Sequence, residues 1–442
     1  MNNDPAGNLS VEYVAPARLI ADPSNPRTHK PPQVAAIAKS MSTFGFNVPV
    51  LADGDGLIIA GHGRVMAAMK LGLVTIPVIR IEHLTVTQRR AYMIADNRLT
   101  DVSRWDDRLL GEVLRDLSVV ELDFDIEAIG FSVGEIDMKI DALDDHSLDR
   151  DDAQPELGPA VTKVGDLWQI GRHRLLCGDA LDSAVWSQLM AGEKAAMVFT
   201  DPPYNVAIAG HVSGLGRVQH REFAMAIGEM DRDQFTAFLA DVFAQMKAHS
   251  KPGSLHYACM DFRHIGEMMA AGEAVFTELK NLCVWVKPSG AMGSLYRSQH
   301  ELVFVWKSGR ARHRNNVELG RHGRNRTNVW TYPAIAAFRH SEGGDLLADH
   351  PTCKPVKLVA DAILDVTARG DIVADPFLGS GTTLIAAERV GRSAYGLELD
   401  PRYCDTIVRR YQALTGDAAI HGASGKTFDD MAAAAIDPEC AA

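Results

Sequence analysis

Residues 371–398 constrain the fold of this chain more than any other stretch. A short strand pattern over 371–375, apolar at 372–374, leads into a turn that contains Gly379 and Gly381. A helical pattern follows, and then a second apolar run that ends at Glu398. A strand, a glycine turn, a helix and a second strand are the repeating unit of a parallel sheet, and such a unit binds ligands beyond the carboxyl ends of its strands. This pattern predicts an α/β fold. The glycine spacing is not that of a nicotinamide dinucleotide site.

A polar cluster follows another apolar run, residues 195–199. It consists of Asp201, Pro202, Pro203 and Tyr204. Because strand ends in an open α/β sheet face the ligand crevice, we expect these four residues to form the catalytic site. The alternatives are a turn or helix-cap role for Asp201 and ordinary core packing for Tyr204.

Together the two motifs resemble those of the S-adenosylmethionine-dependent DNA amino-methyltransferases, over about residues 164–414. The turn Phe377-Leu378-Gly379-Ser380-Gly381 and the stretch His350–Pro355 ahead of it carry the match with the Asp-Pro-Pro-Tyr cluster. The resemblance implies a Rossmann-like methyltransferase sheet, S-adenosylmethionine as methyl donor, and a bacterial or phage restriction–modification setting. The catalytic motif precedes the cofactor turn, as in the β class of the family. Asp201, where cytosine-N4 enzymes usually have serine, favours adenine N6, and cytosine N4 is the alternative.

The chemistry of an amino group explains the catalytic residue types. An exocyclic amino group shares its lone pair with the ring, so acceptors must bind its hydrogens before the nitrogen can attack. The Asp201 carboxylate and the Pro202 carbonyl are suitable acceptors, and positioning matters more than a strong base or a metal. The base must leave the helix stack, and Tyr204 would stack on its face.

The same resemblance assigns residues to the cofactor. Phe377 and the two turn glycines would surround the methionine moiety, Glu398 would bind the ribose, and Asp179 would lie near the adenine. The full set of predicted cofactor residues is Asp179, Lys354, Asp375, Phe377, Gly379, Gly381, Thr382 and Glu398. Three alternatives stay open: a turn role for Asp179, a solvated Lys354, and a helix cap at Thr382.

A basic segment predicts where double-stranded DNA binds. The chain as a whole carries a net charge of -12, yet residues 287–326 are strongly basic. We expect target recognition at about 309–339, with a second loop after Tyr204 closing over the base. The predicted DNA-binding residues are Arg217, Arg297, Arg312, Arg314, Arg321, Arg324 and Arg326. The alternatives are a solvated loop, or methylation of RNA or a protein amide.

Residues 10–140 predict a separate, smaller unit. Short strands, a hairpin turn and the block Gly61-His62-Gly63-Arg64 at a helix start resemble the N-terminal α+β domain of ParB-like and sulfiredoxin-like proteins, over about residues 14–101. The resemblance implies a nucleoside triphosphate at Gly61, His62, Gly63 and Arg64, and a tight turn is the alternative. The stretch from residue 105 predicts a helical extension. A rival interpretation is a nucleotide-gated DNA-binding protein with a secondary methyltransferase half.

The remaining features set the boundaries. Residues 141–160 predict an acidic linker, 161–418 the methyltransferase domain, and 419–442 a flexible tail. The six cysteines contain no C-x-x-C pair, which favours a reduced cytoplasmic compartment and gives no metal motif. We expect no membrane segment, and a homodimer is compatible with these features.

Overall fold

A computed structural model describes most of the chain as two compact units, Met1–Leu143 and Asp144–Ala442, each of which is described by itself. The described residues are 9–102, 105–120, 122–141, 143, 160–205, 230–287, 290, 295–317, 319, 324–332 and 354–436. No helix in these ranges is both long enough and apolar enough to cross a bilayer.

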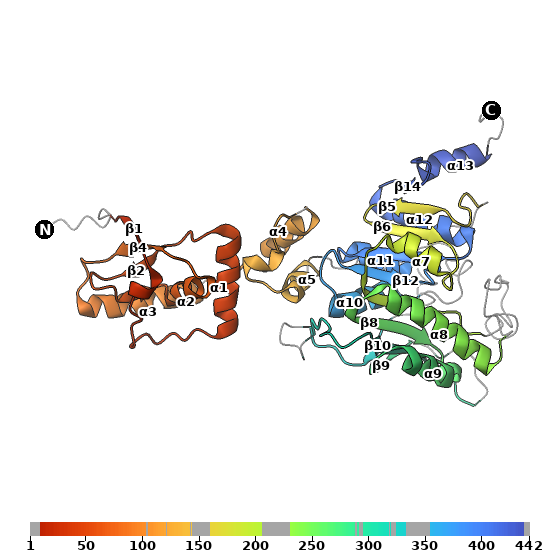
Figure 1. Ribbon diagram of the computed structural model, residues 1–442, viewed down its shortest axis with the longest axis horizontal. Coiled ribbons are helices and arrows are strands. Elements are labelled where there is room, and N and C mark those ends of the chain that lie inside the picture. The colour runs from red at the N-terminus through yellow and green to blue at the C-terminus, as the bar shows by residue number, and fades with distance from the viewer. Residues whose placement is uncertain are drawn as a thin grey trace. The chain divides into compact units, whose positions relative to one another are not determined.

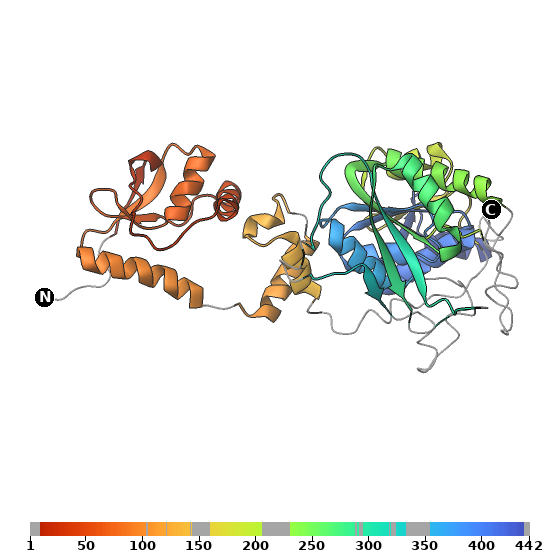
Figure 2. The same ribbon diagram turned by 90° about the horizontal axis from the view of Figure 1, so that it is seen from below.

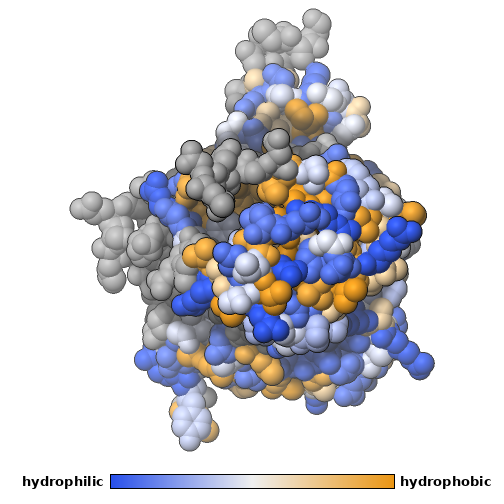
Figure 3. All heavy atoms as spheres, turned by 90° about the vertical axis from the view of Figure 1, so that its left-hand side faces the viewer, coloured by the Kyte–Doolittle hydropathy of each residue, from blue (hydrophilic) through white to orange (hydrophobic). Residues whose placement is uncertain are grey.

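The first unit contains a small mixed sheet with helices, as the sequence predicts. Its strands lie in the order β1-β4-β2-β3. They are β1 (Val11–Val14), β2 (Val50–Ala52), β3 (Ile58–Ala60) and β4 (Ile76–Arg80), accompanied by α1 (Pro31–Phe44), α2 (His62–Leu71) and α3 (Val86–Val102). The predicted hairpin is the antiparallel pair β2–β3. Hydrophobic and hydrophilic residues are interspersed over the face seen in Figure 3, and Tyr13, Met69 and Val74 are among the exposed hydrophobic residues of this unit.

The helical extension begins with α4 (Asp107–Val119) and continues through the short 3-10 helix η2 (Ile126–Ile129) to α5 (Val133–Asp141). Asp106 caps α4 by accepting a hydrogen bond from the Leu109 backbone N–H at 3.0 Å. Leu114 of α4 and Ile136 of α5 are fully buried, so the two helices share a small core.

The second unit is built on a ten-stranded sheet, ordered β11-β9-β10-β8-β7-β12-β13-β6-β5-β14 (Figure 1). The strands are β5 (Leu167–Ile170), β6 (His173–Cys177), β7 (Ala195–Thr200), β8 (Ser250–Met260), β9 (Glu278–Val286), β10 (His300–Lys307), β11 (Val329–Thr331), β12 (Ile372–Asp375), β13 (Ser393–Glu398) and β14 (Ala419–His421). Five neighbouring strands, β8, β7, β12, β13 and β6, run parallel. β10 runs antiparallel to β8. This is the α/β arrangement that the glycine-turn unit predicts.

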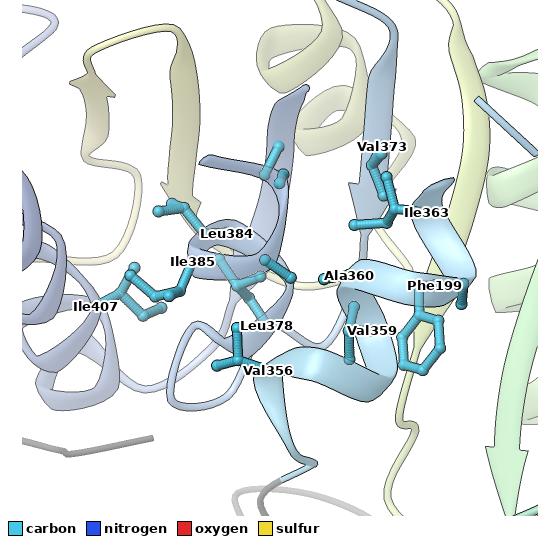
Figure 4. Packing of buried hydrophobic residues seen from close by; sticks show 14 of the residues in the cluster. Phe199, Val356, Val359, Ala360, Ile363, Val373, Leu378, Leu384, Ile385 and Ile407 are labelled. Atoms are coloured by element: carbon cyan, nitrogen blue, oxygen red, sulfur yellow. The ribbon is translucent and has the colours of Figure 1, made fainter. Parts of the chain in front are cut away.

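Helices cover both faces of this sheet (Figures 1 and 2). One face packs against α7 (Ser183–Met190), α8 (Arg232–Ala248) and α9 (Ile265–Val275), and the other against α10 (Val356–Val366), α11 (Thr382–Arg389) and α12 (Pro401–Thr415). Successive residues of β7 alternate between the two cores, Met197 and Phe199 in one and Val198 in the other. Figure 4 shows the core that contains Phe199, where Val356 of α10 lies beside Leu378 and Ile363 lies beside Val373.

The prediction of a flexible tail from residue 419 is wrong over 419–436. β14 pairs antiparallel with β5, and α13 (Phe428–Ile436) follows it. The ring of Phe428 is almost fully buried and lies 5.4 Å from that of Trp168. The long-range strand pairing and this aromatic anchor hold a segment whose small residues resemble those of a loose terminus.

Candidate active site

The glycine turn lies between β12 and α11 and is held to the end of β13. The Gly379 backbone N–H donates to Glu398 Oε2 at 2.8 Å. Gly381, with φ of +90°, precedes the first residue of α11, and a Cβ there would lie 3.0 Å from Ile407. Because both the backbone angle and the close helix require glycine, the turn presents bare backbone beside a carboxylate.

Glu398 and Asp179 belong to adjacent parallel strand ends. Glu398 pairs in register with Cys177, and its carbonyl accepts a hydrogen bond from the Gly178 backbone N–H at 3.0 Å. Asp179 therefore begins the loop next to Glu398. Its Oδ1 accepts from the Leu181 backbone N–H at 2.9 Å, which is the turn chemistry that the sequence left open.

Asp375 is buried within the turn, and Thr382 does not take the helix-cap role that was the alternative to its predicted cofactor contact, which stays a prediction. Asp375 is only 4% exposed, and its carboxylate accepts hydrogen bonds from the Phe377 backbone N–H at 3.0 Å and the Thr383 hydroxyl at 2.7 Å. This burial assigns Asp375 to shaping the turn rather than to touching a ligand. Thr382 makes no side-chain cap, because the capping position is Gly381.

Burial raises the pKa of the Asp375 carboxyl to about 7, and the charge of Asp201 adds to the rise, although the hydrogen bonds from Thr383 and Phe377 oppose it. The ordinary value is 3.8, so the folded protein keeps this proton at a pH where the unfolded chain has lost it. The contribution of Asp375 to the free energy of unfolding therefore falls as pH rises from about 4 to about 7, and it changes no further above that.

Asp375→Asn should abolish this titration. Between pH 5 and pH 8 we expect the free energy of unfolding of the variant to rise by roughly 1–4 kcal/mol relative to that of the wild type. The thermal midpoint of the variant should therefore also rise relative to that of the wild type. Differential scanning fluorimetry at both pH values measures it. An equal difference at the two pH values would show that Asp375 does not titrate there.

Asp201 lies one strand away from the glycine turn. It follows β7, and β7 pairs with β12 through Val198 and Ala374, so the ends of both strands meet at one edge of the sheet. Asp201 Oδ1 accepts a hydrogen bond from the Tyr204 hydroxyl at 2.6 Å. Asp201 Oδ2 accepts one from Lys354 Nζ at 2.5 Å.

A buried charged cluster surrounds that pair. Lys354, only 4% exposed, also lies 2.9 Å from Glu301 Oε2, and Glu301 Oε1 pairs with Lys287. Burial alone would lower the pKa of Lys354, but the charges of Asp201 and Glu301 outweigh it and raise that pKa. Burial would likewise raise the pKa of Glu301, but Lys354 and Lys287 bring it down to about 2. Lys354 and Glu301 are therefore both ionised at neutral pH.

Glu301 and Lys287 are site residues that the sequence did not identify. β10 runs antiparallel to its neighbours, and its second residue, Glu301, precedes the one that pairs with the last residue of β8. Lys287 follows the end of β9, which pairs with the start of β10. A carboxylate inside an otherwise apolar strand was the available signal, since ionised residues are rarely buried unless paired.

Tyr204 packs against both cores of the second unit, and its pKa is raised well above the ordinary value by burial and then by Asp201 and Glu301. Lys354 Nζ lies 5.6 Å from the ring centroid. The phenol therefore stays protonated and donates to Asp201. Each carboxylate oxygen has two lone pairs, so Asp201 retains acceptor capacity for a substrate.

Arg324 and Arg326 do not support the predicted DNA contacts. Arg324 is buried, and its guanidinium donates to Asp365 Oδ1 at 2.9 Å. Arg326 donates to Asp365 Oδ2 at 2.9 Å and lies over the Trp330 ring. Both therefore tie the segment to α10. From composition alone, arginines that pair with buried carboxylates cannot be told apart from arginines on an exposed basic surface.

Other predicted DNA contacts are exposed but lie at opposite ends of β10. Arg312 and Arg314 follow its carboxyl end, and Arg312 contacts the region of Gly253 near the start of β8, at the edge away from Asp201. Arg297 precedes β10 on the Asp201 edge and donates to the Gly290 carbonyl. Arg217 and Arg321, the loop after Tyr204 beyond residue 205, and residues 333–339 lie outside the described residues.

The predicted nucleotide site of the first unit is a closed turn. Gly61 has φ of +104°, and the Arg64 guanidinium folds over it to donate to the Pro49 carbonyl at 3.2 Å. His62 Nε2 accepts from the Asp22 backbone N–H at 3.2 Å. Burial lowers the pKa of both Arg64 and His62. Nucleotide binding at Gly61–Arg64 stays a prediction.

Comparison with known proteins adds two family matches. Residues 195–409 match a family model of N6/N4 methyltransferases described as DNA methylase. Residues 108–164, which include α4 and α5 of the helical extension, match a family model described as ParB-methyltransferase HTH domain.

Individual relatives match about half of the chain. Type II methyltransferase M2.DpnII of Streptococcus pneumoniae is 26% identical over 238 residues, which are 51% of this chain and 85% of that protein. Type II methyltransferase M2.MboI of Moraxella bovis is 25% identical over 230 residues, 50% of this chain and 81% of that protein. The crystal structure of the M1.HpyAVI–SAM complex aligns with a TM-score of 0.40 at 20% identity, covering 53% of this chain and 97% of that one.

Proposed function

We propose that the chain is a DNA amino-methyltransferase that methylates adenine at N6 with S-adenosylmethionine as donor, a proposal supported by the match of residues 195–409 to the N6/N4 DNA methylase family model. The observation that carries the choice of base is the aspartate at position 201, whose carboxylate is held at the strand edge by Tyr204 and Lys354. An ionised acceptor there binds an amino hydrogen more strongly than a neutral hydroxyl would.

The cofactor proposal rests on the neighbouring turn. The bare backbone at Gly379 and Gly381, the Glu398 carboxylate 2.8 Å from the Gly379 nitrogen, and the adjacent loop of Asp179 fit a ligand with ribose hydroxyls. S-adenosylmethionine supplies the methyl group from its sulfonium. The close register of β7 and β12 brings this turn within reach of Asp201, so donor and acceptor need only be aligned.

The chain's own residues then have distinct proposed tasks. Asp201 and the Pro202 carbonyl accept hydrogen bonds from the amino group and turn its lone pair toward the donor. Pro203 fixes the backbone before Tyr204, whose ring packs beside the flipped base. Lys354 keeps the Asp201 carboxylate oriented, and Glu301 balances the lysine charge.

Product analysis tests the proposal. Purified protein is incubated with isotopically labelled S-adenosylmethionine and duplex DNA, which is then digested to nucleosides and separated. We expect the label in N6-methyladenosine of DNA, with no incorporation into matched RNA. Label in N4-methylcytosine would correct the target base, and label in neither would refute the proposed reaction.

A further inference from the structure

Two loops on the Asp201 edge of the sheet each expose a large aromatic ring next to an arginine. Phe262 and Arg263 follow Asp261 just after the end of β8, where Arg263 pairs with Asp261 at 2.8 Å, and Tyr296 and Arg297 precede β10. Tyr296 is 86% exposed, and the adjacent Leu295 is 83% exposed. The two side chains are neighbours in sequence, so together they form an exposed apolar projection beside the catalytic edge.

The connection between β9 and β10 fixes where Tyr296 lies. The Lys287 backbone N–H donates to the Gln299 carbonyl at 2.9 Å, and the Gln299 side-chain amide donates to the Lys287 carbonyl at 2.9 Å, so the hairpin is closed at its base. That base also holds Glu301, whose carboxylate pairs with Lys354 and through it with Asp201. The segment that carries Tyr296 and Leu295 is therefore connected to the catalytic Asp201 through Glu301 and Lys354.

A duplex substrate creates a specific need at this place. A base that leaves the stack opens a gap, and unstacking is costly unless another group fills the space. Exposed apolar or aromatic side chains insert between base steps in proteins that distort DNA, while arginines contact the neighbouring phosphates. Leu295 and Tyr296 are the side chains that could insert between base steps, and Arg297 and Arg263 are the arginines that could contact the neighbouring phosphates.

We propose that Tyr296, assisted by Leu295, is the wedge that fills the gap in duplex DNA left by the flipped target base, with Arg297 at an adjacent phosphate. The proposal rests on the proposed function, because it concerns the same substrate at the same edge. It makes Tyr296 a positioning residue, since it acts on the duplex and not on the reacting nitrogen.

The test compares Tyr296→Ala and Leu295→Ala with the wild-type protein on two duplexes that carry its methylated sequence. In one duplex the target base is paired, and in the other it faces an abasic site, so that it is unpaired and costs less to flip out. For Tyr296→Ala we expect about a tenfold or greater loss of kcat/KM on the paired duplex and recovery to within a few-fold on the abasic duplex. A 2-aminopurine at the target position should brighten on binding wild-type protein but not this variant.

Val74→Ala is the matched control, because Val74 is 83% exposed, as Leu295 is, and belongs to the first unit and to none of the predicted binding sets. It should behave as the wild type on both duplexes. An unchanged rate for Tyr296→Ala, or an equal loss on both duplexes, would overturn the wedge while leaving the methyltransferase activity in place. A lower mass of the variants in sedimentation would instead assign these side chains to contact between copies of the chain. Absence of transfer by the wild type would overturn both the function and the wedge.

Discussion

Lys354→Met should remove nearly all methyl transfer and lower the free energy of unfolding by about 3–5 kcal/mol. The substitution preserves the side chain's length but removes the cation that Asp201 and Glu301 share, so Asp201 loses its cationic partner and the buried Glu301 keeps only Lys287. An uncompensated buried charge costs more than the pair itself gains. Urea unfolding and a filter-binding assay of labelled DNA measure the two effects.

Lys357→Met provides the control on the same helix. Lys357 is 47% exposed and lies 3.6 Å from Asp361, so its loss should change stability by less than about 1 kcal/mol and leave activity intact. If Lys354→Met were as stable and active as Lys357→Met, the charged cluster would have no part in holding Asp201.

Asp201→Asn is expected to lower the turnover rate by about 10²–10⁴-fold while leaving cofactor affinity nearly unchanged. The amide keeps the size of the carboxylate but loses its charge, and one of its two acceptor atoms becomes a donor. Cofactor contacts are proposed on β12 and β13, and Asp201 follows β7, which explains the expected separation of the two effects. Single-turnover kinetics and calorimetry with S-adenosylmethionine measure them.

Asp371→Asn serves as a comparison at the opposite end of β12, where Asp371 pairs with the exposed Lys251 at 3.0 Å. Its rate should stay within about twofold of the wild type. Retention of more than a tenth of the wild-type rate by Asp201→Asn would remove Asp201 from its proposed catalytic role.

Contiguous motifs were the part of the site that the sequence could predict. The glycine turn and the Asp201–Tyr204 cluster each lie within a few residues and follow recognisable strands, so their placement at one sheet edge followed from the topology of parallel strands. The pairing of Lys354 with Asp201 spans 153 residues, and Glu301 belongs to an antiparallel strand. Neither spacing nor composition encodes such a contact.

The basic segment shows the limit of composition most clearly. Its arginines were grouped as DNA contacts because they are close in sequence. The fold separates them into Arg324, buried against Asp365, and Arg312, exposed at the far end of β10. The partner carboxylates are on α10, about forty residues later, and only tertiary packing brings them together.

The central position of β12 and β13 has a consequence for synthesis of the protein. These strands lie between β7 and β6 in the sheet but are among the last to leave the ribosome. A nascent chain that ends before residue 371 contains β5, β6 and β7 without the strands that join them. The sheet can close only when the cofactor strands insert, so truncated products would carry Asp201 without a methyl donor site and could not modify DNA.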